Sequence, residues 1–337
     1  MISLQIKPRG RPIKKLPSTI ELDLATATTE TLYTRLSAYT GLSRDRLRLT
    51  KGSDGSVVTV KRESGKDVMV EELGLREGST VFVKDLGPQV AWRTVFVIEY
   101  LGPLFIHPLL LYVVRPYIYS SSPLNPLSYI LFGPSLKPGQ ELPPPTQTQT
   151  LLCALVVLHF LKREYETLFI HRFSAGTMPF RYIFRNSAHY WILSGVNLAY
   201  SLYTPTASPA ASWWPAALNA DNNPTVVYSM VVLWVFAQIS SFKTHLTLRN
   251  LRPANSTKRQ IPKGYGFDSV TCPNYSFEVL SWICVWVLSG GNWAASLFIL
   301  AGTTVMFLWA QKKEKRYRKE FGSAYKKKRN VMVPGIL

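Results

Sequence analysis

Apolar residues are distributed along this chain in two different ways, and the change comes near residue 86. Before it they occur in short runs separated by polar residues. From Val90 onward they form long stretches, and about 20 apolar residues are what a helix needs to cross a bilayer. The pattern predicts a mainly α-helical integral membrane protein with a soluble N-terminal domain at 1–86 and a membrane-embedded domain at 87–337. About six spans are predicted, at 91–114, 150–170, 184–203, 225–242, 277–289 and 293–311.

The first 86 residues combine the periods of strands with that of one helix. Residues 1–6 alternate between apolar and polar side chains, and 28–39 fit an amphipathic helix. Three further strand-like runs, separated by glycine-containing turns, lie at 47–49, 57–60 and 80–84. This order resembles a ubiquitin-like β-grasp domain. No apolar signal-peptide region opens the sequence, so we expect this domain to stay in the cytosol.

Composition supports the membrane interpretation. The 337 residues carry a formal net charge of +19, yet 47% of them are hydrophobic and nine are Trp. A soluble nucleic-acid-binding protein is the competing interpretation of the charge, but the basic residues lie between apolar runs and form no continuous patch. The three cysteines lie in or beside apolar segments without metal-ligand spacing, which predicts buried thiols and no metal site.

Basic residues also predict the orientation in the membrane. The loops at 171–185 and 243–270 and the tail from 312 are rich in Lys and Arg, whereas 204–224 has none and 120–150 has only Lys137. Cytosolic loops carry the excess of positive charge. An even number of spans with both termini in the cytosol follows.

Polar residues at the edge of an apolar segment mark a candidate site. Asn274, Tyr275 and Glu278 lie at the start of the span at 277–289, where burying polar groups is costly and tends to be functional. Glu99, inside the first span, needs either a polar cavity or an ion-pair partner. His171, at the end of the second span, is either a catalyst or a hydrogen-bonded helix-end residue, which is the commoner role for a single His.

A pair of arginines predicts a phosphate contact on the cytosolic side. Arg249 and Arg252 are three residues apart, so two guanidinium groups can grip phosphate oxygens of a ligand or, alternatively, of a lipid headgroup. The tail segment 312–319 offers more cations, most of which we expect to be solvated. No GxGxxG follows a strand and no GxxxxGK[ST] occurs, which excludes a Rossmann or P-loop nucleotide site.

Four segments, taken together, resemble the very-long-chain trans-2-enoyl-CoA reductases, members of the steroid 5-alpha-reductase family of integral membrane, NADPH-dependent reductases. They are ETLFIHRFSAGTMP at 166–179, LRNLRP at 248–253, CPNYSFE at 272–278 and YRKEF at 317–321. The resemblance covers nearly the whole chain and includes the ubiquitin-like domain. It therefore implies residue roles along most of the sequence.

The resemblance implies two groups of site residues. Tyr275 would be the proton donor, and the residues facing the reacting group or lying on the substrate-side helix would be Glu99, His171 and Lys162. The residues that hold NADPH would be Arg249, Arg252, Asn274, Glu278, Lys313 and Tyr317. Asn250 and Ser241 depart from the family, which often has Asp and Asn there.

These roles fit the chemistry of enoyl reduction. A 2,3-trans-enoyl thioester needs a hydride at C3, stabilisation of the enolate that forms, and a proton at C2. The phenol of Tyr275, with an ordinary pKa of about 10, stays protonated at neutral pH and can donate. His171, Lys162 or a protonated Glu99 would polarise the carbonyl, and the sequence does not decide among them.

The expected function is thus the last step of very-long-chain fatty acid elongation at the endoplasmic reticulum membrane. The substrate would be a very-long-chain trans-2-enoyl-CoA held among membrane lipids. Expected protein partners are the other elongation enzymes, namely the condensing enzyme, the ketoacyl-CoA reductase and the hydroxyacyl-CoA dehydratase. The alternatives are a steroid or polyprenol double-bond reductase of the same family and a non-catalytic membrane adaptor.

Overall fold

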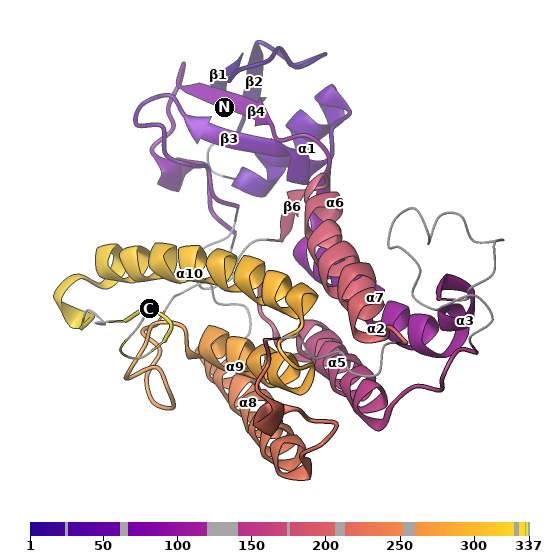
Figure 1. The fold of residues 1–337 in the computed structure, drawn as a ribbon. Helices are drawn as coiled ribbons and strands as arrows, with labels where there is room; N and C mark the ends of the chain where they lie inside the picture. Colours follow the sequence, from indigo (N-terminus) through magenta and orange to yellow (C-terminus); the bar gives the residue numbers. More distant parts are fainter. Residues whose placement is uncertain are drawn as a thin grey trace. The chain divides into compact units, whose positions relative to one another are not determined.

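The computed structural model describes residues 1–23, 26–60, 67–119, 141–173, 176–205, 213–251, 260–326, 330–333 and 335. The chain divides into two compact units (Figure 1). The first is built from Met1–Thr94 and includes Phe173–Tyr182, and the second comprises Val95–Arg172, Ile183–Leu251 and Ile261–Leu337. The domain boundary expected after residue 86 stays a prediction.

A mixed four-stranded sheet with one helix forms the centre of the first unit. Its strands are β1 (Ile2–Pro8), β2 (Thr19–Leu22), β3 (Leu47–Lys51) and β4 (Thr80–Asp85), in the order β2-β1-β4-β3. The β1 and β4 strands pair in parallel and the other two pairs are antiparallel. Alternate apolar side chains of the strands, such as Leu4 and Ile6, are buried against α1 (Thr29–Thr40).

Sequence signals explain where α1 begins and ends. The hydroxyl oxygen of Thr28 accepts a hydrogen bond from the amide of Thr31, which caps the start of the helix. Gly41, with a φ of 69°, ends it in the left-handed conformation that glycine adopts without strain. A separate two-stranded antiparallel sheet joins β5 (Gln89–Ala91) to β6 (Thr177–Pro179).

The second unit is helical. Its long helices are α2 (Trp92–Leu109, whose first turn lies in the first unit), α5 (Gln147–Tyr165), α8 (Pro224–Asn250), α9 (Pro273–Leu288) and α10 (Trp293–Phe321). Shorter helices are α3 (Arg115–Ile118), α6 (Tyr182–Ser187) and α7 (Leu198–Leu202). Wider π-helical turns follow α2, α5 and α6, at Leu110–Val114, Glu166–Ile170 and Ala188–Asn197 respectively. Such turns are uncommon and often lie at functional sites.

Among the described residues, three helical stretches are long and apolar enough to cross a membrane: Trp92–Ile118, Pro224–Asn250 and Trp293–Ala324. They overlap the first, fourth and sixth predicted spans, so the membrane character of the chain is confirmed. The other predicted spans, at 150–170, 184–203 and 277–289, are largely helical in the structure. Their crossing of a bilayer, and hence the count of six, stays a prediction.

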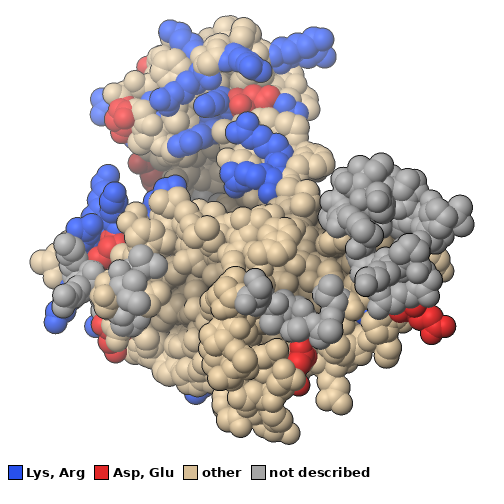
Figure 2. Space-filling model, in the orientation of Figure 1, with Lys and Arg blue, Asp and Glu red and all other residues tan. Residues whose placement is uncertain are grey.

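Helix α8 of this unit places apolar side chains outside and polar side chains inside. Tyr228, Val232 and Ile239 of α8 are exposed, while Gln238 and Ser241 of the same helix are buried. Figure 2 shows a broad area of the helical unit without charged side chains. In water such an apolar surface is a liability, whereas in lipid it is the favoured exterior.

Candidate active site

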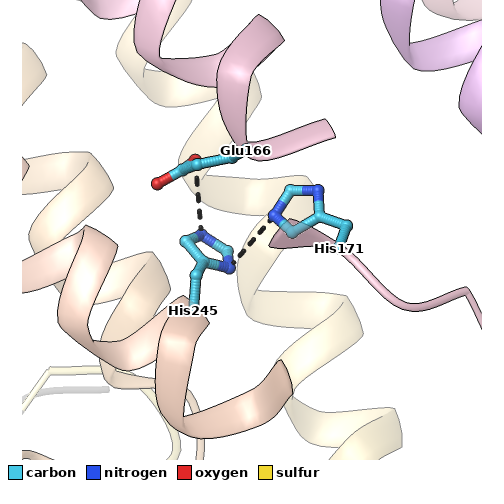
Figure 3. A group of neighbouring side chains, drawn as sticks. All are labelled: Glu166, His171 and His245. Carbon is cyan, nitrogen blue, oxygen red and sulfur yellow. Dashed lines mark hydrogen bonds and ion pairs between the residues drawn. The ribbon is translucent and has the colours of Figure 1, made fainter. Parts of the chain in front are cut away.

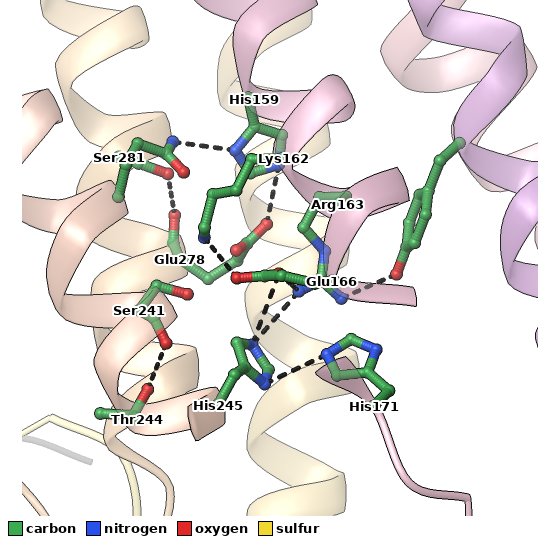
Figure 4. Close-up of polar contacts among 12 residues, drawn as sticks. His159, Lys162, Arg163, Glu166, His171, Ser241, Thr244, His245, Glu278 and Ser281 are labelled. Carbon is green, nitrogen blue, oxygen red and sulfur yellow. Dashed lines mark hydrogen bonds and ion pairs between the residues drawn. The ribbon is translucent and has the colours of Figure 1, made fainter. Parts of the chain in front are cut away.

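Polar side chains at helical spacing line one face of α5 and its continuation. His159, Lys162, Arg163 and Glu166 recur at intervals of three and four residues, so they project from the same side of the helix (Figure 4). This face is directed at α8 and α9, which pack closely against each other. The polar centre of the unit is built on it.

Glu166 is the fully buried carboxylate at that centre. Its Oε1 lies 3.1 Å from the Nζ of Lys162, and its Oε2 accepts a hydrogen bond of 2.6 Å from Arg163. A second nitrogen of the Arg163 guanidinium donates to the hydroxyl of Tyr100 on α2 at 2.8 Å. The planar donors of Arg thus connect two helices around one buried anion.

The π-helical turn brings His171 back toward this carboxylate. The amide of His171 donates to the carbonyl of Glu166 at 2.7 Å, closing the wide turn. His245 of α8 lies between the two side chains (Figure 3). Its Nδ1 is 3.3 Å from Nε2 of His171, and its Nε2 is 3.9 Å from Oε2 of Glu166.

Glu166, His171 and His245 offer the ligand types of a metal site, and their donor atoms lie within 4.8 Å of one another. However, Arg163 already donates to both Glu166, at 2.6 Å, and His245, at 3.2 Å. A divalent cation would have to displace this guanidinium and then lie beside its positive charge. The arrangement therefore favours a hydrogen-bonded network over a metal centre.

A second carboxylate, that of the half-buried Glu278 on α9, is held by His159. The Nε2 of His159 lies 3.0 Å from Oε1 of Glu278, and its Nδ1 lies 2.9 Å from the amide nitrogen of Gln238 on α8. The amide nitrogen of Gln can only donate, so Nδ1 accepts and Nε2 carries the proton toward Glu278. Three helices are thereby connected through one imidazole.

Tyr275 lies one turn before Glu278, at the start of α9. The Nζ of Lys313, on α10, is 5.8 Å from the centre of its ring, which places a cation near the phenol. Neighbouring Asn274 is buried, and its Oδ1 has no hydrogen-bond partner among the described residues. An unsatisfied buried acceptor is unusual and indicates a missing donor such as a ligand.

The C-terminal tail holds the start of α9 in place. The amide of Cys272 donates to the carbonyl of Val331 at 2.9 Å. Glu314 of α10 accepts hydrogen bonds of 2.6 Å from both Thr271 and the hydroxyl of Tyr325. The proton-donor candidate is therefore carried by a helix end that is anchored on two sides.

The structure connects several of the sequence-predicted residues and leaves others apart. Lys162 and His171 belong to the Glu166 network, Glu278 joins it through its neighbours on α5, and Tyr275 and Lys313 lie together. Glu99 is buried beside Tyr100, with one carboxylate oxygen unpartnered among the described residues. Arg249 is half-buried in the last turn of α8, Tyr317 packs against Phe321 and Tyr325, and Arg252 lies outside the described residues.

Sequence reasoning missed a set of network residues: Tyr100, His159, Arg163, Gln238 and His245. On α5 the signal was present, because polar residues at 159, 162, 163 and 166 follow the helical period within an apolar segment. On α8 the same period joins Gln238 and Ser241 to His245. Charged or polar stripes on predicted spans would have located the site.

Residues 176–337 match the family model described as 3-oxo-5-alpha-steroid 4-dehydrogenase. Over its whole length the chain is 41% identical to a Schizosaccharomyces pombe protein named "Putative enoyl reductase", covering all of both chains. It is 36% identical to the very-long-chain enoyl-CoA reductase of Dictyostelium discoideum, covering 90% of each chain. A Caenorhabditis elegans protein named "Probable very-long-chain enoyl-CoA reductase" is 34% identical, over 88% of this chain and 89% of its own. The chain belongs to the very-long-chain enoyl-CoA reductases of the steroid 5-alpha-reductase family.

Proposed function

We propose that this protein catalyses the NADPH-dependent reduction of trans-2-enoyl-CoA to saturated acyl-CoA, the last step of very-long-chain fatty acid elongation. Family membership supports the reaction class. The observation that carries the proposal is the position of Tyr275, at the anchored start of α9, beside Lys313 and one turn from the buried network. An acid at this point is held rigidly, as proton transfer requires.

The residues present fit a nicotinamide cofactor. Asn274 has a buried acceptor without a donor among the described residues, Arg249 lies in the last turn of α8, and Lys313 lies beside Tyr275 in the same unit. We propose that these three, with Arg252, Glu278 and Tyr317, hold NADPH. When bound, the cofactor would supply the hydride for C3.

The chain's own residues would control the proton and the developing charge. Tyr275 would donate its phenolic proton to C2, and the cation of Lys313 would stabilise the phenolate left behind. Among the candidates for polarising the thioester carbonyl, Lys162 is already paired with Glu166. His171 is therefore the better donor to the carbonyl oxygen, with Glu99 contributing on the α2 side.

The membrane setting follows from the substrate. Transfer of each CH2 group from water to an apolar environment is worth about 0.8 kcal/mol, so a helical bundle in lipid suits a very long acyl chain. We propose an endoplasmic reticulum membrane protein with six spans and both termini in the cytosol, in contact with other elongation enzymes. The sheet order of the first unit supports a ubiquitin-like domain as the site of such a contact.

The test is NADPH consumption by detergent-purified protein mixed with long-chain trans-2-enoyl-CoA. Wild-type protein should oxidise NADPH, and Tyr275→Phe should lose activity by about 100-fold or more, within the range attributed to a general acid, while still binding NADPH. Tyr228→Phe is the matched control, because Tyr228 is an exposed phenol of α8 and should be indifferent. Full activity of Tyr275→Phe would exclude the proposed donor.

Two outcomes would favour the alternatives. The family model over 176–337 carries the name of a steroid dehydrogenase, so NADPH oxidation with a 3-oxo-4-ene steroid or a polyprenol but not with enoyl-CoA would support that branch. Absence of NADPH binding by a folded protein would support the adaptor. Saturated acyl-CoA, identified by mass spectrometry, would exclude both as the principal function.

A further inference from the structure

The hydrogen bonds around His245 determine which of its nitrogens carries the proton. A guanidinium group can only donate, and Arg163 lies 3.2 Å from Nε2 of His245. That nitrogen must therefore be the acceptor and must lack a proton. The proton of a neutral His245 is then on Nδ1.

The same logic extends to His171. The Nδ1 of His245 lies 3.3 Å from Nε2 of His171 (Figure 3), and because Nδ1 is the donor, Nε2 of His171 is the acceptor. The proton of a neutral His171 is consequently on its own Nδ1. Because Arg163 can only donate, the two hydrogen bonds that join it through His245 to His171 determine which nitrogen of His171 carries the proton.

Arg163 is itself immobilised, which gives this chain of bonds a fixed origin. The same nitrogen that reaches His245 also donates to Glu166 at 2.6 Å, and the other donates to Tyr100 at 2.8 Å. The guanidinium carbon lies 5.1 Å from the centre of the Tyr100 ring. A planar group held by a carboxylate, a phenol and an imidazole has little freedom to turn.

We propose that Arg163 and His245 are positioning residues that hold His171 as a neutral imidazole with its proton on Nδ1, the hydrogen-bond donor for the thioester carbonyl oxygen. This inference rests on the proposed function, because it names the donor of that same reaction. Glu166 acts one step further back, by holding Arg163.

A neutral donor suits the chemistry at this point. The enolate oxygen needs a hydrogen bond that strengthens as negative charge develops, whereas the proton for C2 comes from Tyr275. His171 therefore keeps its proton throughout, and no second acid is consumed. Holding the imidazole in one tautomer avoids reorganisation at the moment of reaction.

Two substitutions of His245 separate positioning from simple space filling. The amide of Asn lies near the place of Nδ1, so His245→Asn keeps a donor toward His171. The longer Gln reaches the place of Nε2, so His245→Gln keeps the contact with Arg163 and loses the donor toward His171. Both replace an imidazole by an amide with the same donor and acceptor groups.

The expected result is a difference between the two variants in kcat. Because small misplacements of a catalytic group cost up to about 100-fold, His245→Gln should lose about 10- to 100-fold in kcat with KM for enoyl-CoA nearly unchanged. His245→Asn should retain most of the wild-type kcat. Equal losses in the two variants, or no loss in either, would overturn the proposal.

A spectroscopic measurement tests the tautomer without any turnover. With 15N-labelled histidine in the detergent-solubilised protein, the signals that disappear in His171→Ala should show a protonated Nδ1 and an unprotonated Nε2 in wild type. In His245→Gln this pattern should change. A protonated Nε2 in wild type would overturn the proposal even if the protein proved inactive toward enoyl-CoA, which keeps this test distinct from that of the reaction.

A metal control completes the design. The three side chains of Figure 3 have ligand chemistry, so wild-type activity should be measured after treatment with EDTA and after addition of Zn2+. Unchanged activity is expected. Loss on chelation with recovery on Zn2+ would replace the proposed hydrogen-bond chain with a metal site.

Discussion

The buried charges around Glu166 allow a quantitative prediction. Replacing Glu166 by Gln removes the carboxylate shared by Lys162 at 3.1 Å and Arg163 at 2.6 Å, while the two cations stay buried. Breaking a buried pair in this way costs about 3–5 kcal/mol, because an uncompensated charge remains in a poorly solvated place. We therefore expect Glu166→Gln to lower the free energy of unfolding by that amount, although the substitution hardly changes side-chain volume.

The matched control is the double variant Lys162→Met with Glu166→Gln, which removes one charge of each sign and leaves Arg163 beside Tyr100 and His245. Coupling between contacting charges is typically about 0.5–3 kcal/mol, so the double variant should be more stable than the sum of the two single variants by that amount. Unfolding would be followed in detergent micelles by tryptophan fluorescence during titration with sodium dodecyl sulfate. If the free energy of unfolding of Glu166→Gln were within about 0.5 kcal/mol of the wild-type value, as it is for neutral surface changes, the argument for a charge-balanced centre would be refuted.

Three further outcomes are expected. Arg46 lowers the pKa of Asp85 through a bidentate contact, so the pair stabilises β4 above the unfolded pKa of about 3.9. This stability is lost as the pH falls through the folded pKa of Asp85. Hydrogen exchange of the β4 amides should therefore show Asp85→Asn to be less stable than wild type by about 0.5–1 kcal/mol at pH 7 and no different at pH 2. Gly291 has a φ of 72°, and a Cβ there would approach the ring of Trp214 to 2.5 Å. Gly291→Ala should therefore lower the midpoint temperature of thermal unfolding. Gly302→Ala is the control and should not lower it, because no atom lies within 4 Å of a Cβ at that position. Gln238→Met removes the hydrogen bond to Nδ1 of His159, the imidazole that holds Glu278, which is one of the proposed NADPH-binding residues. The affinity for NADPH, measured by cofactor fluorescence, should fall several-fold. Unchanged affinity would show that His159 does not act on the cofactor through Glu278.

Much of the chain's architecture is encoded in local patterns. Alternation at residues 1–6 became β1, the amphipathic segment at 28–39 became α1 within one residue at either end, and residues 80–84 became β4. β2 was missed, because Thr19–Leu22 has only four residues and two apolar positions. Residues 57–60 form no named strand, and Val57 makes an isolated bridge with Thr50. Short strands depend on tertiary pairing that no local period records.

Candidate residues could be singled out from the sequence where one segment carries them and not where segments meet. Asn274, Tyr275 and Glu278 were singled out because they share one helix start at the edge of an apolar segment, and their roles stay predictions. His245 was not, since its importance comes from contacts with residues about 80 positions earlier. The π-helical turn that brings His171 toward Glu166 has no sequence signature of its own, because it differs from an α-helix only by one additional residue in the turn. Long-range contacts and a local change in helix type thus account for what was missed.

Helix α8 exposes apolar residues and buries polar ones, as expected where lipid and not water surrounds a helix. In water, burying Tyr228, Val232 and Ile239 would stabilise the protein. In lipid these apolar side chains gain no free energy by moving from the exterior to the interior of the bundle. Gln238, which water would otherwise solvate, must instead find its partner inside the bundle, and it finds it in His159. The side chains of Glu166, Arg163 and His245 are fixed by one another in this way, and the resulting order extends to His171. The same requirement that makes polar residues costly inside a membrane also makes their hydrogen-bond directions determinate, which is why a tautomer can be derived from this structure at all.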